Sequence, residues 1–179
     1  MALFRIGSNP GSNPPPPTFD DPVAVLASCH RKIEDRLAQL ERASAALGSP
    51  EAMDVLGEVV RHFDTAGVKH TEDEEASIFP RLAGEGIDDL IESLEADHRA
   101  AEAIYLAVRT VIGRLAAAPE LASELEDELV THGRALAAAY RDHIRREEAE
   151  LFPHLRKLEA AQLRAIGIEM RLRRGGDGI

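Results

Sequence analysis

Apolar side chains recur at alternating spacings of four and three along four successive segments of this 179-residue chain. Such a rhythm keeps one face of an α-helix apolar and is typical of helices that pack nearly parallel in a bundle. The first two stripes are Leu26, His30, Ile33, Leu37, Leu40, Ser44 and Leu47, then Met53, Leu56, Val60, Phe63, Gly67, His70 and Glu74. The other two are Ile87, Ile91, Leu94, His98, Ala101, Tyr105, Val108, Ile112 and Leu115, then Leu125, Leu129, His132, Leu136, Ala139, His143 and Glu147.

Short helix-breaking segments separate these stripes, at residues 48–50, at residues 84–86 and near Pro119. Short connections make neighbouring helices antiparallel. We therefore expect an all-α fold, an antiparallel up-down-up-down four-helix bundle over residues 21–160. A disordered Pro/Gly/Ser-rich tail is expected at residues 1–20, and a short helical C-terminal extension at residues 161–179.

Four of the seven histidines have a glutamate four residues later, one pair in each expected helix. The pairs are His30 with Glu34, His70 with Glu74, His98 with Glu102, and His143 with Glu147. Residues i and i+4 share a helix face, so each pair directs an imidazole and a carboxylate the same way. The four histidines, Glu74 and Glu147 lie on the apolar stripes, whereas Glu34 and Glu102 lie beside them.

Two further patterns indicate that these pairs converge. His30 and His70 each lie about 20 residues from the first break, and His70 and His98 about 14 residues from the second, so an antiparallel bundle places them in one layer. In addition, HTEDEEASIFPRL from His70 matches HIRREEAELFPHL from His143, and HRKIE from His30 resembles HRAAE from His98. This repeat predicts a duplicated helical hairpin with pseudo-twofold symmetry around a shared site.

A single HxxxE is typical of a hydrogen-bonded pair on a helix surface, but buried carboxylates without a cation cost several kcal/mol or must take up a proton. The set of four therefore predicts a metal site. Nitrogen and carboxylate ligands without thiolate suit iron or manganese, and zinc less well. Eight groups exceed the needs of one ion, so we expect two ions bridged by Glu74 and Glu147. Glu34 and Glu102 are expected as terminal ligands or as outer carboxylates that hold an imidazole N–H.

Composition and net charge argue against several classes of function. The formal charge of −11 argues against nucleic acid and anionic membrane partners. The single cysteine, Cys29, excludes a disulfide framework and is expected to be a small packed residue rather than a redox thiol. No stretch has the length of a signal-peptide core or of a membrane span, so a cytoplasmic protein is expected.

The residues quoted above resemble the hemerythrin-like, or HHE cation-binding, family over about residues 22–158. The shared pattern is a lone His on the first helix, HxxxE followed by (I/L)FPxL on the second, a His on the third and HxxxE on the fourth. The resemblance implies a non-haem di-iron centre with an oxo or hydroxo bridge, which binds O₂, hydrogen peroxide or nitric oxide and acts in oxygen binding or oxidative stress.

The pattern departs from that of oxygen-carrying hemerythrins at two places. Their third helix has a second histidine where this chain has Glu102, and their last helix spaces a histidine and an aspartate by five residues rather than four. A carboxylate-rich site favours the ferric state. We therefore expect reaction with O₂ or peroxide, including a catalase-like decomposition of peroxide, or alternatively O₂, NO or iron sensing without turnover.

Other residues carry weaker expectations. His132 is expected to be a hydrogen-bonded core histidine, and His62 a surface residue. Tyr105 and Tyr140 are expected either to pack in the core or to donate hydrogen bonds near the ligands. A third functional class is a purely structural bundle in which His and Glu pair, and this class predicts equal stability with and without metal.

Overall fold

The computed structural model describes residues 18–47 and 49–175, and over these residues it is helical and contains no strand. The elements are α1 (Pro22–Ser44), α2 (Pro50–His62), η1 (Phe63–Gly67), α3 (Val68–Asp73), η2 (Glu74–Ile78), α4 (Phe79–Leu82), α5 (Asp88–Ala117), η3 (Pro119–Leu121), α6 (Ala122–Arg146), η4 (Glu147–Leu151), α7 (Phe152–Leu155) and α8 (Ala160–Arg173). The all-α prediction is confirmed. Most of the predicted tail, residues 1–17, lies outside the described residues, as do residues 176–179.

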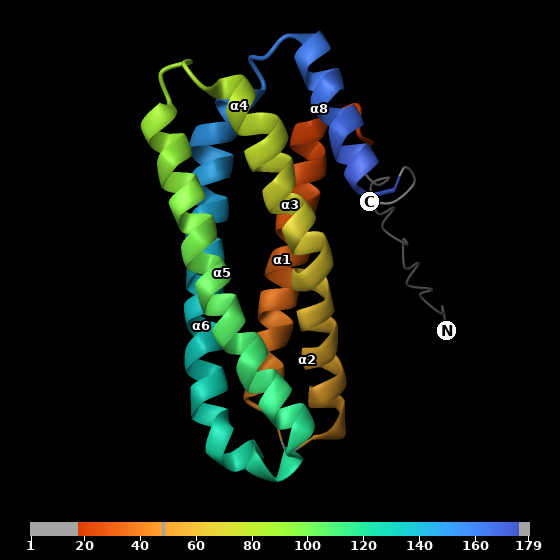
Figure 1. The fold of residues 1–179 in the computed structure, drawn as a ribbon, viewed down its shortest axis with the longest axis vertical. Helices are drawn as coiled ribbons and strands as arrows, with labels where there is room; N and C mark the ends of the chain where they lie inside the picture. Colours follow the sequence, from red (N-terminus) through yellow and green to blue (C-terminus); the bar gives the residue numbers. More distant parts are fainter. Residues whose placement is uncertain (1–17, 48, 176–179) are drawn as a thin grey trace, which may run out of the picture.

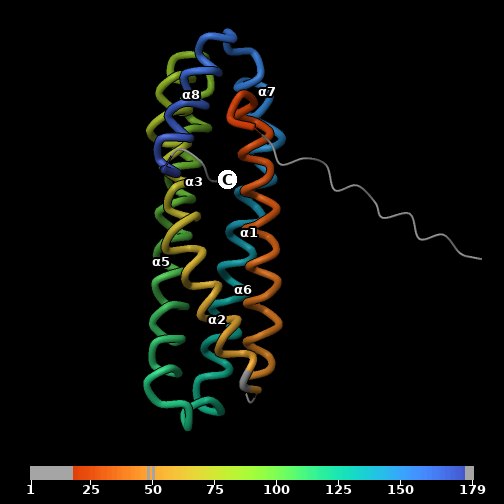
Figure 2. The backbone as a smooth tube through the Cα atoms, turned by 90° about the vertical axis from the view of Figure 1, so that its right-hand side faces the viewer, coloured from red at the N-terminus to blue at the C-terminus, as the bar shows by residue number. Residues whose placement is uncertain are grey.

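In the described part of the chain the longer elements form rods that run side by side in Figure 1, in chain order α1, then α2 to α4, then α5, then α6 to α7. The second rod is continuous from α2 to α4, and the fourth runs from α6 to α7. Contacts between α1 and α2, α2 and α5, α5 and α6, and α6 and α1 close the rods into a ring, and Figure 2 shows α1 beside α6. The turns between rods fall at the predicted helix breaks.

Local sequence signals account for the helix starts. The Asp21 side chain accepts a hydrogen bond from the Ala24 N–H, and Pro22 occupies the first turn of α1, where its missing N–H is not needed. Ser49 caps α2 in the same way, through the Ala52 N–H.

Among the described residues, two apolar clusters fill the interior, one on each side of a polar layer. On α1, Leu26 belongs to one cluster and Ile33 to the other, and His30 lies between them. On α5, Leu94 and Tyr105 belong to different clusters, and His98 lies between them. The stripe histidines therefore occupy a polar layer enclosed above and below by apolar packing, which restricts the access of water.

The helix α8 packs beside the upper part of the bundle and contacts α1, α3 and η2 (Figure 1). Its contact is close, because a Cβ added to Gly167 would lie 1.8 Å from the Phe19 carbonyl oxygen. Arg173 adds a 2.7 Å ion pair with the fully buried Asp73, and Arg81 pairs with Glu169 at 2.7 Å. The extension is thus part of the packed structure around the second rod.

None of the helices among the described residues has the length and the apolar composition needed to cross a membrane.

Candidate metal centre

Six of the predicted ligands meet in the polar layer and form two overlapping groups. One group is His30, His70, Glu74 and Glu147, and the other is Glu74, His98, His143 and Glu147. Within each group one ligand atom per residue lies within 4.8 Å of every other. Both glutamates belong to both groups, so the arrangement has the form of two adjacent cation sites that share two carboxylates.

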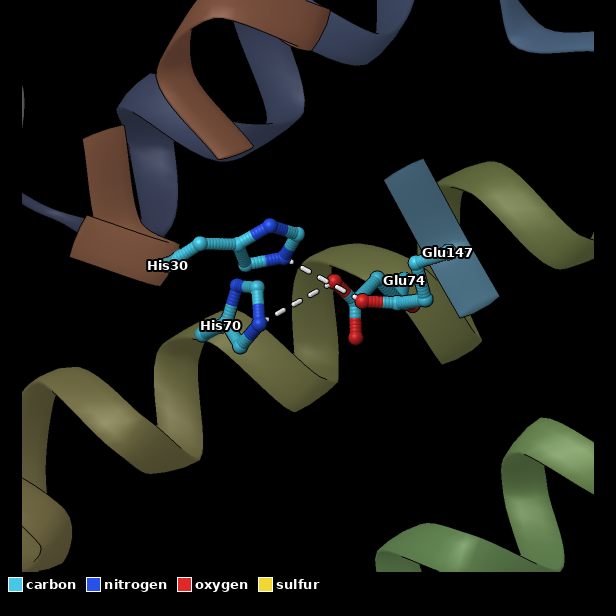
Figure 3. A group of neighbouring side chains, drawn as sticks. All are labelled: His30, His70, Glu74 and Glu147. Carbon is cyan, nitrogen blue, oxygen red and sulfur yellow. Dashed lines mark ion pairs between the residues drawn. The ribbon is translucent and has the colours of Figure 1, made fainter. Parts of the chain in front are cut away.

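Each glutamate lies between a histidine of its own helix and a histidine of another rod. The Glu74 carboxylate lies 3.2 Å from Nε2 of His70 and 3.1 Å from Nε2 of His98. The Glu147 carboxylate lies 3.3 Å from Nε2 of His143 and 3.2 Å from Nε2 of His30. Figure 3 shows the first group, in which both imidazoles point toward the carboxylates. The two halves of the repeat thus make equivalent contacts.

Glu74 and Glu147 also mark changes in the helical rods. The π-turns η2 and η4 begin at these residues, and each leads into the Phe-Pro dipeptide that opens α4 or α7. Proline lacks an N–H and its ring meets the carbonyl four residues earlier, so a widened turn lets the rod continue through it. The repeat was visible in the sequence, but its wider turns were not predicted.

The ligand atoms are buried without the partners that such groups require. Among the described residues, both carboxylate oxygens of Glu74 and of Glu147, and Nε2 of His30 and His70, are buried and have no hydrogen-bond partner. Buried polar atoms without a hydrogen-bond partner are destabilising unless another group satisfies them. A cation placed among them would satisfy them together, so the donor set fits a metal.

The electrostatics of the cluster lead to the same conclusion. Burial and the neighbouring Glu147 carboxylate raise the pKa of Glu74 well above its ordinary value. Burial also disfavours the charged form of Glu147, but the neighbouring imidazoles of His143 and His30 outweigh this effect and lower the pKa of Glu147. Burial, followed by the neighbouring His30, lowers the pKa of His70 well below its ordinary value. Without a cation, one carboxyl group of the pair holds a proton that a metal would displace.

Outer carboxylates orient two of the four imidazoles. Nδ1 of His30 lies 2.9 Å from Oε1 of Glu148, and Nδ1 of His98 lies 2.8 Å from Oε1 of Glu75. A hydrogen bond at Nδ1 fixes the tautomer whose Nε2 is free to bind a metal. Glu75 and Glu148 were not predicted as functional residues, although each is the second Glu of the repeated HxxxEE motif.

The structure leaves Glu34 and Glu102 outside both groups. Both side chains are exposed, and neither holds an imidazole N–H, since Glu75 and Glu148 do so. The stripe explains their position, because the residue that follows His30 on the seam is Ile33, three residues later. In this structure neither predicted role, terminal ligand or outer carboxylate, is visible for Glu34 or Glu102.

Aromatic rings pack against the histidines that come from the first and third rods. Phe152 stacks on His30 with ring centroids 5.5 Å apart, and Phe79 stacks on His98 at 6.0 Å. Both phenylalanines come from the Phe-Pro dipeptides of the repeat. The rings shield the imidazoles from water and hold their planes, which preorganises the ligands.

A recess of about 630 Å³ opens beside the cluster between the second rod and α5. Its lining includes the ligand His98, the outer carboxylate Glu75, and Glu102. Tyr140 also lines it, and burial, Glu74 and Glu102 raise the pKa of Tyr140 to about 12, so its hydroxyl stays protonated. Tyr105 lines the recess as well, and its hydroxyl hydrogen is shared between the Asp64 carboxylate at 2.7 Å and the Val60 carbonyl oxygen at 3.1 Å.

Two other histidines lie apart from the centre. His132 was expected to be a hydrogen-bonded core histidine, but it is only partly buried, and it belongs to neither ligand group. His62 was expected on the surface, but it is partly buried and its Nε2 is enclosed, because η1 and α1 pack around it.

These features define a helical protein with a buried histidine and carboxylate cluster suited to metal cations. Comparison with protein families gives the same result, since the model of the hemerythrin HHE cation-binding domain matches residues 21–155. The chain therefore belongs to the hemerythrin HHE cation-binding family. Searches of curated proteins and of solved structures gave no match.

Proposed function

We propose that the chain is an antiparallel up-down-up-down bundle that holds a non-haem di-iron centre, and that this centre reacts with a small oxidant. The oxidant is O₂, hydrogen peroxide or nitric oxide, and decomposition of peroxide is the activity we favour. The observation that carries the proposal is the sharing of Glu74 and Glu147 between two ligand groups. One ion, in either group, would leave the two histidines of the other group without a partner.

The donor set supports iron. It offers four imidazole nitrogens and two carboxylates with no thiolate, since Cys29 belongs to neither ligand group. This combination suits iron or manganese better than zinc, which prefers four ligands. When bound, a pair of iron ions supplies the two-electron redox chemistry that peroxide decomposition needs.

The protein's own residues would bind the metal ions, orient the ligands and shield the centre from water. His30 and His98 present Nε2 to the centre because Glu148 and Glu75 hold their Nδ1 atoms. The recess beside His98 is large enough to admit a diatomic molecule or peroxide. The protonated Tyr140 hydroxyl lines that recess and is available there as a hydrogen-bond donor to an entering molecule.

The test begins with elemental analysis and an absorption spectrum of untagged protein expressed in iron-supplemented medium. We expect about two iron ions per chain with near-ultraviolet absorption. Oxygen release is then measured after addition of hydrogen peroxide. His70→Ala removes a buried ligand and is expected to abolish both metal binding and gas release, whereas Glu34→Gln, at an exposed carboxylate, is expected to change neither.

Two outcomes would contradict the proposal in different ways. Little bound metal, or one zinc ion per chain, would overturn the di-iron centre itself. A full complement of iron that forms stable adducts with O₂ or nitric oxide but releases no gas from peroxide would overturn turnover and favour a sensor or an iron-binding module.

A further inference from the structure

A second recess lies on the other side of the second rod, between α1, the end of α2, η1, α3 and the residue that follows α8. Its volume is about 270 Å³, and it is separate from the one beside His98. Its lining is Cys29, Lys32, Ile33, His62, Thr65, Ala66, Lys69 and Arg174. In Figure 1 the helix α8 ends to the right of the upper part of α1, and it also contacts α3.

The charge of this recess is opposite to that of the chain. The protein has only three lysines and a net charge of −11, yet Lys32 and Lys69 both line this one recess together with Arg174. No carboxylate belongs to the lining as the structure describes it. Within residues 18–47 and 49–175, neither Lys32 nor Lys69 forms an ion pair. Two ammonium groups are therefore left for an external anion.

Arg174 adds positive charge despite its ion pair. It lies 2.5 Å from Oδ2 of Asp73, and Arg173 holds Oδ1 of the same carboxylate at 2.7 Å. One carboxylate thus faces two guanidinium groups, which leaves one positive charge in excess. The contact also fixes the Arg174 side chain, which is 9% exposed, against the recess wall beside the Cys29 sulfur at 3.8 Å.

The imidazole of His62, which lines the recess, has its pKa shifted by burial and by nearby positive charges. Burial first, and then the nearby Arg36 and Lys32 cations, lower the pKa of His62. A histidine that is neutral near pH 7 adds no charge of its own but can donate or accept a hydrogen bond. The positive charge of the recess therefore comes from the lysines and Arg174.

We propose that this recess binds a small tetrahedral oxyanion, phosphate or the phosphoryl group of a small molecule. Two flexible ammonium groups and a guanidinium fork match the charge and the oxygen geometry of such a group. A polyanion such as nucleic acid is disfavoured, because the remaining surface is acidic and the recess accommodates a single group. The proposal goes beyond the metal centre and does not depend on its redox activity.

The scarcity of lysine provides a direct test. Reductive ¹³C-methylation keeps the lysine charges and gives one NMR signal for each of the three lysines besides the amino terminus. Inorganic phosphate and methyl phosphate are titrated in separate experiments at constant ionic strength, against chloride, into full-length protein loaded with zinc and into protein treated with chelator. We expect saturable shifts of the Lys32 and Lys69 signals in both forms, while the signal of Lys157, an exposed residue away from the recess, stays fixed.

Charge-matched variants complete the experiment. Lys32→Gln and Lys69→Gln assign the signals and should each weaken phosphate binding about tenfold, whereas Lys157→Gln should leave it unchanged. Saturation with both ligands supports a phosphoryl site, and saturation with inorganic phosphate alone restricts it to the free ion. Equal, unsaturated drift of all three signals, or saturation only in the zinc-loaded protein and independent of Lys32 and Lys69, would overturn the proposal.

Discussion

Replacement of Glu74 by leucine should make the metal-free protein more stable while it removes metal binding. Glu74 is fully buried, and among the described residues neither of its carboxylate oxygens has a hydrogen-bond partner. An unsatisfied buried polar group costs about 1–3 kcal/mol, and leucine fills a similar volume without that cost. We therefore expect the free energy of unfolding of metal-free Glu74→Leu to exceed that of the wild type by about 1–3 kcal/mol.

Bound metal should reverse the order of stability of the wild type and Glu74→Leu. Wild-type protein at a free metal concentration a thousand times its Kd gains about 4 kcal/mol, because only the folded state holds the assembled ligands. Glu74→Leu lacks a carboxylate that belongs to both ligand groups and should gain almost nothing. The variant is thus the more stable protein in chelator and the less stable protein with metal, with a change in Tm of roughly 2–4 °C for each kcal/mol.

The assay is urea denaturation followed by circular dichroism, with chelator and with zinc as a redox-inert ion. Glu34→Leu is the matched control, because it makes the same substitution at an exposed site and should change neither value by more than about 0.5 kcal/mol. Destabilisation of the metal-free protein by Glu74→Leu would refute this prediction, since Glu74 would then be a structural partner of the histidines. Equal stabilisation of the wild type and Glu74→Leu by metal would refute it as well.

Three further predictions concern the surroundings of the centre. Glu148→Gln should weaken metal affinity about 10–100-fold, as measured by chelator competition, because it weakens the hydrogen bond that orients His30. An unchanged affinity would show that this hydrogen bond does not contribute to metal binding. Burial lowers the pKa of His30, but its glutamate partners raise it to about 8, so its stabilisation of the metal-free protein is present below pH 6.5 and lost as the pH rises through 8. Urea denaturation between pH 6.5 and 8 should show this loss of stability in the metal-free protein but not in the metal-loaded protein. Gly167→Ala should lower stability by about 1–3 kcal/mol, because the added Cβ would collide with the Phe19 carbonyl, while Gly57→Ala, which has open space, should be neutral or stabilising.

The apolar rhythm of the sequence was enough to predict the helices and to separate inner from outer glutamates. On the second and fourth rods the stripe continues from histidine to glutamate in four residues, and Glu74 and Glu147 are buried. On the first and third rods it continues in three residues, so the seam position falls at Ile33 or Ala101, and Glu34 and Glu102 face outward. The residues three and four positions after a histidine lie about 100° apart around the helix, so the step that the stripe takes decides which of the two faces the core.

The sequence by itself thus determined which residues enter the polar layer, because helix periodicity is a local property of the chain. Only the tertiary structure decided what those residues meet. Glu148 reaches His30, 118 residues away, and Arg174 reaches Cys29, 145 residues away, since rods from distant parts of the chain lie side by side. Such contacts depend on packing distances and on the wider turns at η2 and η4. Neither is encoded in the spacing of residues along one helix.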